Sequence, residues 1–255
     1  MKKTPLIYVD HGSPMRILED NLINDKLSIL GNDLQKSEIK AILIISAHWI
    51  TRGTYITTSK DLETIHDFYG FPDDLYDLNY PVKTSSFLID EIKNIFPNIG
   101  ENSNYGLDHG AWTVLKKLFP KADIPVVQMS IDLNLEAKDY FDIGKKLSIL
   151  REKGILIIGS GSIVHNLRDF SWEENVVYSW AKDFDEKIKT YILKGEFENI
   201  VNYEKIENYE RSIPSFDHFV PLLYILGAVD GGEKLTYFYE NISNGSLTNN
   251  IIIKK

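Results

Sequence analysis

Residues 41–53 of the chain read AILIISAHWITRG, an apolar run of strand length that leads directly into His48 and Trp49. The run is rich in isoleucine and does not alternate with polar residues, which is typical of a strand buried on both faces of a sheet. Three further segments share this character: LIYV (6–9), IPVVQMSI (124–131) and GILIIGS (154–160). We therefore predict that these four segments are the buried strands of a sheet.

Amphipathic patterns lie between these strands. Apolar residues spaced three and four apart predict helices, which we place at 18–34, 84–96, 111–119, 137–152 and 179–195. Residues 215–229 predict a further helix from about His218, with Pro221 in its first turn. The segments 233–240 and 246–255 predict two more strands around a Gly/Asn turn.

The alternation of strands and helices favours an α/β fold. No internal repeat and no Pro/Gly linker interrupts the chain. We therefore expect residues 1–255 to form a single domain, with a central, mainly parallel or mixed sheet flanked by helices on both faces.

The composition narrows the classes of function. Of 255 residues, 43% are hydrophobic and 25% charged, as in an ordinary globular protein. The net charge of −9 and the lack of clustered Lys and Arg argue against nucleic acid as a partner. No apolar run approaches the roughly 18 residues of a membrane span, so we expect no membrane partner. The absence of cysteine excludes Cys-ligated metals and favours a cytoplasmic protein; the oligomeric state is left open.

Three of the six histidines follow buried strands, namely His11, His48 and His165. Ligands bind beyond the carboxyl ends of parallel strands, where neighbouring strands deliver their loops to one side. His218, at the start of a predicted helix, could reach the same edge. A single histidine after a strand is more often a residue at the sheet edge whose hydrogen bonds are made within the protein. Three histidines in the same position relative to their strands favour side chains that meet at one site. Because imidazole suits Zn and Fe(II), we predict a mononuclear metal site.

Other chemistries have weaker signals. The segment GSGSIV (159–164) lacks both the third glycine of a dinucleotide loop and the lysine of a P-loop, and the chain has no G-x-S-x-G or H-E-x-x-H motif. The aromatic loop HDFYGFPDDLY (66–76), together with Trp49, could wall a site for a flat apolar substrate. A packed surface loop is an equally good interpretation of the same residues.

Six blocks together resemble a known family. They are HGSPM (11–15), SAHW (46–49), IHDFYGFP (65–72), DHGAW (108–112), VHNL (164–167) and DHFVPLLYILGA (217–228). In this order they resemble the LigB-type extradiol ring-cleavage dioxygenases, in particular the branch similar to 4,5-DOPA extradiol dioxygenase. The resemblance implies that a catecholic substrate reacts with O2 to give a ring-opened semialdehyde.

The resemblance also implies roles for individual residues. His11 and His48 match metal ligands, and His218 stands where more distant relatives carry a glutamate ligand. His165 matches an acid/base residue that can also approach the metal as a further ligand, and His109 matches a catalytic histidine near the substrate. One divalent ion is implied, with Fe(II) expected for activity and Zn(II) plausible as the bound ion.

The substrate pocket is the part that transfers least. We expect Trp49, His66, Phe68 and Tyr69 to contact the substrate, but Tyr69 replaces a small residue of the family pattern. A second departure is Asp10, which precedes His11 where a glycine is common and could perturb the metal electrostatically.

Two alternative functions use the same histidines. One is a zinc-dependent hydrolase, which would need no oxygen. The other is a non-catalytic, Memo-like binding protein. Memo-like proteins lack part of the ligand set, whereas every candidate position is filled in this chain, which favours catalysis.

Overall fold

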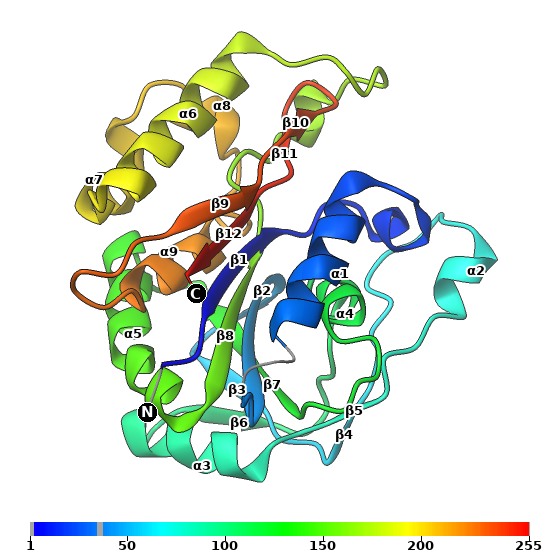
Figure 1. Ribbon diagram of the computed structural model, residues 1–255, viewed down its shortest axis with the longest axis vertical. Helices are drawn as coiled ribbons and strands as arrows, with labels where there is room; N and C mark the ends of the chain where they lie inside the picture. Colours follow the sequence, from blue (N-terminus) through cyan, green and yellow to red (C-terminus); the bar gives the residue numbers. More distant parts are fainter. Residues whose placement is uncertain (1–2, 35–37, 255) are drawn as a thin grey trace.

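The computed structural model describes residues 3–34 and 38–254. Its centre is a mixed eight-stranded sheet with the order β6-β3-β7-β2-β8-β1-β12-β9 (Figure 1). The strands of this sheet are β1 (Leu6–Asp10), β2 (Ala41–Thr51), β3 (Tyr55–Thr57), β6 (Gly100–Asn102), β7 (Val126–Asp132), β8 (Ile155–Gly161), β9 (Thr236–Tyr239) and β12 (Ile251–Lys254). Two small two-stranded sheets lie outside it, β4 (Asp61–Leu62) with β5 (Val82–Lys83) and β10 (Ile242–Ser243) with β11 (Leu247–Thr248).

The four strands predicted from the apolar runs form the middle of the sheet. β7, β2, β8 and β1 are neighbours, and all three pairings are parallel. Every residue of β1, β7 and β8 is buried, as expected for runs without alternation. β12 pairs antiparallel with both β1 and β9, which makes the sheet mixed. The predicted α/β fold is confirmed.

Helices cover both faces of the sheet (Figure 1). Successive residues of β1 alternate between two apolar clusters, with Leu6 and Tyr8 in one and Ile7 and Val9 in the other. The second cluster also contains α1 (Leu22–Leu34) and α4 (His109–Leu118). The first contains α3 (Ser86–Ile95), α5 (Ala137–Leu147), α6 (Ser179–Lys194) and α9 (Val220–Gly227).

Short helices complete the structure. They are α2 (Asp73–Tyr76), α7 (Phe197–Val201) and α8 (Tyr209–Ser212), with 3₁₀ turns η1 (Pro14–Leu18), η2 (Ser148–Lys153), η3 (Leu167–Asp169) and η4 (Tyr203–Lys205). Two predicted helices were too long, because η1 precedes α1 and η2 replaces the last turn expected after α5. The helix expected from His218 begins at Val220, with Pro221 in its first turn.

Two of the three strand-end histidines lie elsewhere than predicted. β2 continues through His48 to Thr51, and its register with β7 is irregular between Ile45 and Ile50. His48 therefore lies within the distorted end of the strand and not after it. β8 ends at Gly161, and His165 lies beyond it in an isolated bridge to Leu247. Of the three, only His11 directly follows its strand.

The start of α9 packs tightly against the end of β8. The amide of Ser162 donates to the His218 carbonyl oxygen at 2.8 Å. A Cβ added to Gly161 would lie 2.1 Å from that same oxygen, which is far inside van der Waals contact. This close approach fixes the backbone of His218 against the edge of the sheet.

We expect Gly161→Ala to destabilise the fold by about 1–3 kcal/mol, because the α9 backbone must shift to admit the methyl group. Urea unfolding measures this change in the free energy of unfolding. Gly231→Ala is the matched control, since an added Cβ there has no neighbour within 4 Å among the described residues. Equal stability of the two variants would contradict the close packing.

Candidate metal centre

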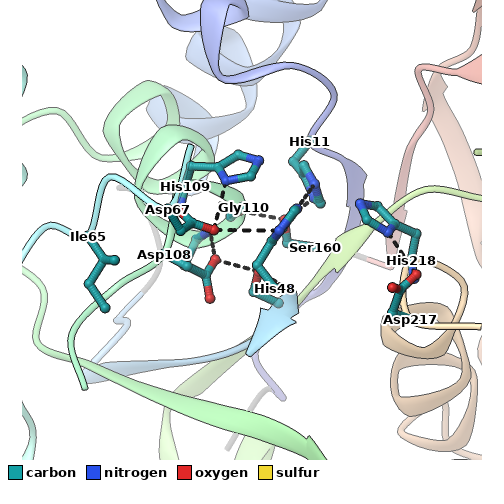
Figure 2. Close-up of polar contacts among 12 residues, drawn as sticks. His11, His48, Ile65, Asp67, Asp108, His109, Gly110, Ser160, Asp217 and His218 are labelled. Carbon is teal, nitrogen blue, oxygen red and sulfur yellow. Dashed lines mark hydrogen bonds and ion pairs between the residues drawn. The ribbon is translucent and has the colours of Figure 1, made fainter. Parts of the chain in front are cut away.

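Three histidine side chains converge at the edge where β1, β2 and β8 end (Figure 2). One ring nitrogen from each of His11, His48 and His218 lies within 4.8 Å of the other two. The Nε2 atoms of His11 and His48 are 3.0 Å apart. The three ring centroids are separated by 4.9 to 5.3 Å. Three imidazole nitrogens at these distances could hold one metal ion.

Hydrogen bonding fixes the tautomer of His11. The Ser160 hydroxyl donates its hydrogen to the Gly110 carbonyl oxygen at 2.5 Å. Ser160 Oγ can therefore only accept from His11 Nδ1, which lies 3.1 Å away. With its proton on Nδ1, His11 keeps a free lone pair on Nε2, the atom that faces His48.

Carboxylates do the same for the other two rings. Asp217 Oδ1 lies 2.9 Å from His218 Nδ1. Asp67 Oδ2 lies 3.5 Å from His48 Nδ1. Because an ionised carboxylate only accepts hydrogen bonds, Asp217 holds the proton of His218 on Nδ1. The longer contact with Asp67 favours a proton on Nδ1 of His48. With these tautomers both Nε2 lone pairs remain available. Such outer partners are typical of histidines that bind metals.

The donor set fits a divalent cation. Burial, followed by the neighbouring histidines, lowers the pKa of His11 well below 6.5. Burial, together with His109 and His218, lowers the pKa of His48 to about 2. Both rings are therefore neutral at pH 7, and their facing lone pairs repel each other unless a cation lies between them. Ligand nitrogens bonded at about 2.1 Å to one ion stand roughly 3.0–3.4 Å apart, which matches the 3.0 Å separation.

One side of the cluster is open to solvent. The side chains of His48, Asp67 and Asp217 keep 23%, 22% and 24% exposure, whereas His11 is buried. A small ligand can therefore approach from the side of His48.

His165 lies against His218. The two rings stack with centroids 3.8 Å apart and an interplanar angle of 4°. Its backbone amide donates to the Ser212 carbonyl oxygen. Burial, and next the charge of His218, lowers the pKa of His165 to about 3. His165 is thus a neutral imidazole, and a weaker base than an unperturbed histidine, whose pKa is near 6.5.

His109 is the first residue of α4 and lies on the other side of His48, with ring centroids 3.9 Å apart. Its Nδ1 is 3.0 Å from Asp67 Oδ2, and its backbone amide donates to Asp67 Oδ1 at 2.8 Å. Burial alone would raise the pKa of Asp67, but the hydrogen bonds from His109 outweigh it and lower the pKa below 3.8. His48, Asp67 and His109 form a second group whose ligand atoms lie within 4.8 Å of one another.

The four aromatic residues predicted at the substrate differ in position. The Phe68 ring meets His109 edge-on, with centroids 5.8 Å apart. His66 is packed behind it, and its Nε2 donates to the Leu78 carbonyl oxygen. The indole of Trp49 is buried and stacks on Tyr105 at 4.3 Å. The side chain of Tyr69 is 92% exposed. Only Phe68 is in contact with the histidine cluster through a ring pair.

Asp10 is fully buried, and its carboxylate accepts the amides of Ile163 and Asn250 at 3.1 and 2.8 Å. Burial raises its pKa to about 6. These bonds tie the segment after β8 to the start of β12, so Asp10 holds together the segments that carry His11 and His165. Asp10 stands where the family pattern commonly has a glycine, and these hydrogen bonds give its carboxylate a structural role.

Sequence reasoning missed the partners of the imidazoles, namely Ser160, Asp67 and Asp217. Two of them were visible in the quoted blocks, as the aspartates of IHDFYGFP and DHFVPLLYILGA. For Asp217 the available signal was its place directly before His218, a candidate ligand. Asp67 had no such signal, since it lies 42 residues from His109 in the chain. Ser160 had no such signal, since it lies 149 residues from His11 in the chain.

Comparison with known proteins decides the family. The family model described as the catalytic LigB subunit of aromatic ring-opening dioxygenase matches residues 4–247. The chain belongs to the LigB family. An Escherichia coli (strain K12) protein named 4,5-DOPA dioxygenase extradiol is 42% identical over 253 residues, covering 96% of this chain and 93% of that protein. A Beta vulgaris protein of the same name is 33% identical over 248 residues, covering 94% and 92%.

A solved structure agrees. The crystal structure of an uncharacterized Escherichia coli K12 protein superposes with a TM-score of 0.85 and 37% identity, covering 98% of this chain and 99% of that one. The 255-residue chain itself is therefore an oxidoreductase, an extradiol aromatic ring-opening dioxygenase of the LigB family. Enzymes of this family depend on a metal and act on an aromatic substrate with O2. Among the described residues, no helix is both long and apolar enough to cross a membrane.

Proposed function

We propose that residues 1–255 form one catalytic domain that opens the ring of a catechol of the DOPA type next to its hydroxyl groups, with O2, to give a semialdehyde. The single observation that carries this proposal is the convergence of His11, His48 and His218 with their Nε2 lone pairs unblocked. The names of the relatives support the choice of a DOPA-like substrate. The net charge of −9 argues against nucleic acid as a partner. The absence of cysteine supports a cytoplasmic location.

We propose His11, His48 and His218 as the metal ligands and Fe(II) as the active ion, with Zn(II) as an ion the site could also retain. When bound, Fe(II) supplies the positions at which a catechol and O2 meet and the redox chemistry between them. A neutral three-histidine set leaves the charge of the ion uncompensated, whereas a carboxylate ligand would cancel one unit. This favours binding of the substrate as an anion.

His165 is proposed as the acid/base residue, with a direct ligand role as the alternative. Its neutral ring can take a proton from a catechol hydroxyl, and the negative charge of the bound catecholate would raise its low pKa and help it to hold that proton. The proton can later be returned to the opening ring.

His109 is proposed as a catalytic residue that contacts the substrate directly. Its Nδ1 proton points to Asp67, so its Nε2 lone pair is free to accept a hydrogen bond from a substrate hydroxyl. Phe68, which packs against His109, is proposed to contact the flat face of the ring. His66, whose ring packs against Phe68, is proposed to support this wall from behind, and Tyr69 to contact the outer end of the substrate. Trp49, which stacks on Tyr105, is proposed to hold the end of β2 from the opposite face.

We expect oxygen uptake and a yellow ring-opened semialdehyde when the enzyme, reconstituted anaerobically with Fe(II), meets a panel of catechols that includes DOPA in air. The matched control is the same protein loaded with Zn(II), which is expected to consume no oxygen because Zn(II) has no redox chemistry. If the Zn(II)-loaded protein instead hydrolysed a substrate in the absence of oxygen, the result would support the zinc hydrolase. If no catechol of the panel gave oxygen uptake or product while the metal stayed tightly bound, the result would support a non-catalytic binding protein.

A further inference from the structure

We propose that Asp67 is a positioning residue for ring opening, whose one carboxylate sets the ring orientation and the proton position of both His48 and His109. The proposal rests on the proposed function, in which His48 binds the metal and His109 contacts the substrate. Asp67 lies in the block IHDFYGFP, but the sequence assigned it no role. Its carboxylate joins two histidines that come from different elements, β2 and α4.

The contact with His109 is made twice. Asp67 Oδ1 accepts the backbone amide of His109 at 2.8 Å, and Oδ2 accepts from the ring Nδ1 at 3.0 Å. Two bonds to one residue hold both its backbone and its ring, so the imidazole is confined to one orientation. Because the carboxylate can only accept, the ring proton stays on Nδ1 and the Nε2 lone pair faces away from Asp67.

The contact with His48 uses the same oxygen. Asp67 Oδ2 is 3.5 Å from His48 Nδ1, a separation that is long for a hydrogen bond but close for an electrostatic contact. It favours a proton on Nδ1 and leaves Nε2 facing His11. When Nε2 of a histidine binds a cation, its Nδ1 proton becomes more acidic, and a carboxylate at that position stabilises the ligand. Oδ2 thus links the metal ligand to the substrate residue.

The backbone beneath Asp67 is built to hold this position. The amide of Ile65 donates to the Leu107 carbonyl oxygen, and the Trp112 indole donates to the Ile65 carbonyl oxygen at 3.0 Å. The segment before Asp67 is therefore fixed to α4 and to the residues that lead into it. Asp217 and Ser160 each serve one imidazole, whereas Asp67 serves two (Figure 2).

The test is Asp67→Asn, studied first by ¹⁵N NMR of the histidine rings in the Zn(II)-loaded protein. The amide has a single acceptor oxygen, and its NH₂ group donates. It cannot accept from both donors of His109, so we expect the His109 ring to move its proton to Nε2 or to lose a fixed tautomer. In the Fe(II) enzyme we expect kcat to fall by about 10–100-fold, with a smaller change in KM. The metal content is expected to remain one ion per chain.

Two controls make the result specific. Asp74→Asn changes an exposed carboxylate seven residues further along the chain, in α2, and is expected to leave both the tautomer and kcat unchanged. Asp217→Asn removes the carboxylate from His218 alone and is expected to leave the tautomer of His109 unchanged. If Asp67→Asn does not fold, Asp67→Glu gives the second test. It keeps an acceptor-only group and is expected to hold the Nδ1 proton on His109.

Three outcomes would overturn the proposal. One is a His109 ring that keeps its Nδ1 proton in Asp67→Asn, with unchanged kcat. Another is an Asp67→Glu variant in which the His109 proton moves to Nε2. The third is a second metal ion that is bound by the wild-type protein and lost in Asp67→Asn, which would make Asp67 a ligand. A wild-type enzyme that opens no catechol refutes the proposed function, and the NMR measurement still tests the positioning of His109.

Discussion

A His48→Ala variant is expected to lose the metal ion that the wild-type enzyme binds. The change removes one of three Nε2 donors, and it leaves His11 Nε2 facing an empty space where a nitrogen stood 3.0 Å away. Loss of an outer partner of a ligand already costs 10–100-fold in affinity, so loss of the ligand itself should cost more than about 100-fold. Competition with a chromophoric chelator measures the affinity, and elemental analysis measures the metal content.

His66→Ala is the matched control for this variant. It makes the same chemical change in a histidine whose Nε2 is occupied by the Leu78 carbonyl oxygen, and it should keep one ion per chain. The two variants also differ in what they leave behind, since His48→Ala deprives Asp67 of a neighbouring imidazole whereas His66→Ala does not. If His48→Ala bound the ion with wild-type affinity, the centre would lie elsewhere.

The central part of the fold could be predicted from local chemistry. A strand buried on both faces must be apolar throughout, so the Ile-rich runs identified β2, β7, β8 and β1. Pairing between distant segments carries no comparable signal. The antiparallel placement of β12 beside β1 depends on contacts between residues at the two ends of the chain, such as Leu6 and Lys254.

For the candidate site, the sequence could predict that the histidines meet at one edge of the sheet. The histidines converge because β2, β8 and β1 are neighbours and their carboxyl ends meet at one edge. The position of Trp49 could have been inferred, since successive side chains of a strand point to opposite faces. If His48 faces the cluster, Trp49 must face the other way, and it does so against Tyr105.

The electrostatics of the site could not be inferred from the sequence. The pKa of a histidine depends on how much water its ring retains and on which charges surround it. His165 lies half-buried against His218, and the loss of water around its ring, followed by the charge of His218, lowers its pKa to about 3. The spacing of residues in the sequence does not predict that the rings of His165, after β8, and His218, before α9, stack on each other.

A His165→Gln variant is expected to keep its metal ion and to lose turnover by about 100- to 10,000-fold, the usual contribution of a general acid or base. Glutamine can still donate and accept hydrogen bonds from a similar position, but it cannot take up a proton and return it. The three nitrogens that lie within 4.8 Å of one another do not include His165, which is why the ion should stay. Oxygen uptake with a catechol, alongside metal analysis of the same sample, measures both quantities.

The stacking of His165 on His218 does not blur the distinction between an acid/base role and a metal-ligand role for His165. Removing the His165 ring takes away a neighbour at 3.8 Å, but the hydrogen bond from His218 Nδ1 to Asp217 remains and keeps Nε2 free. Orientation of the third donor therefore does not depend on His165. A His165→Gln protein that lost its metal together with its activity would identify His165 as a fourth ligand, and the acid/base role would then have to pass to His109.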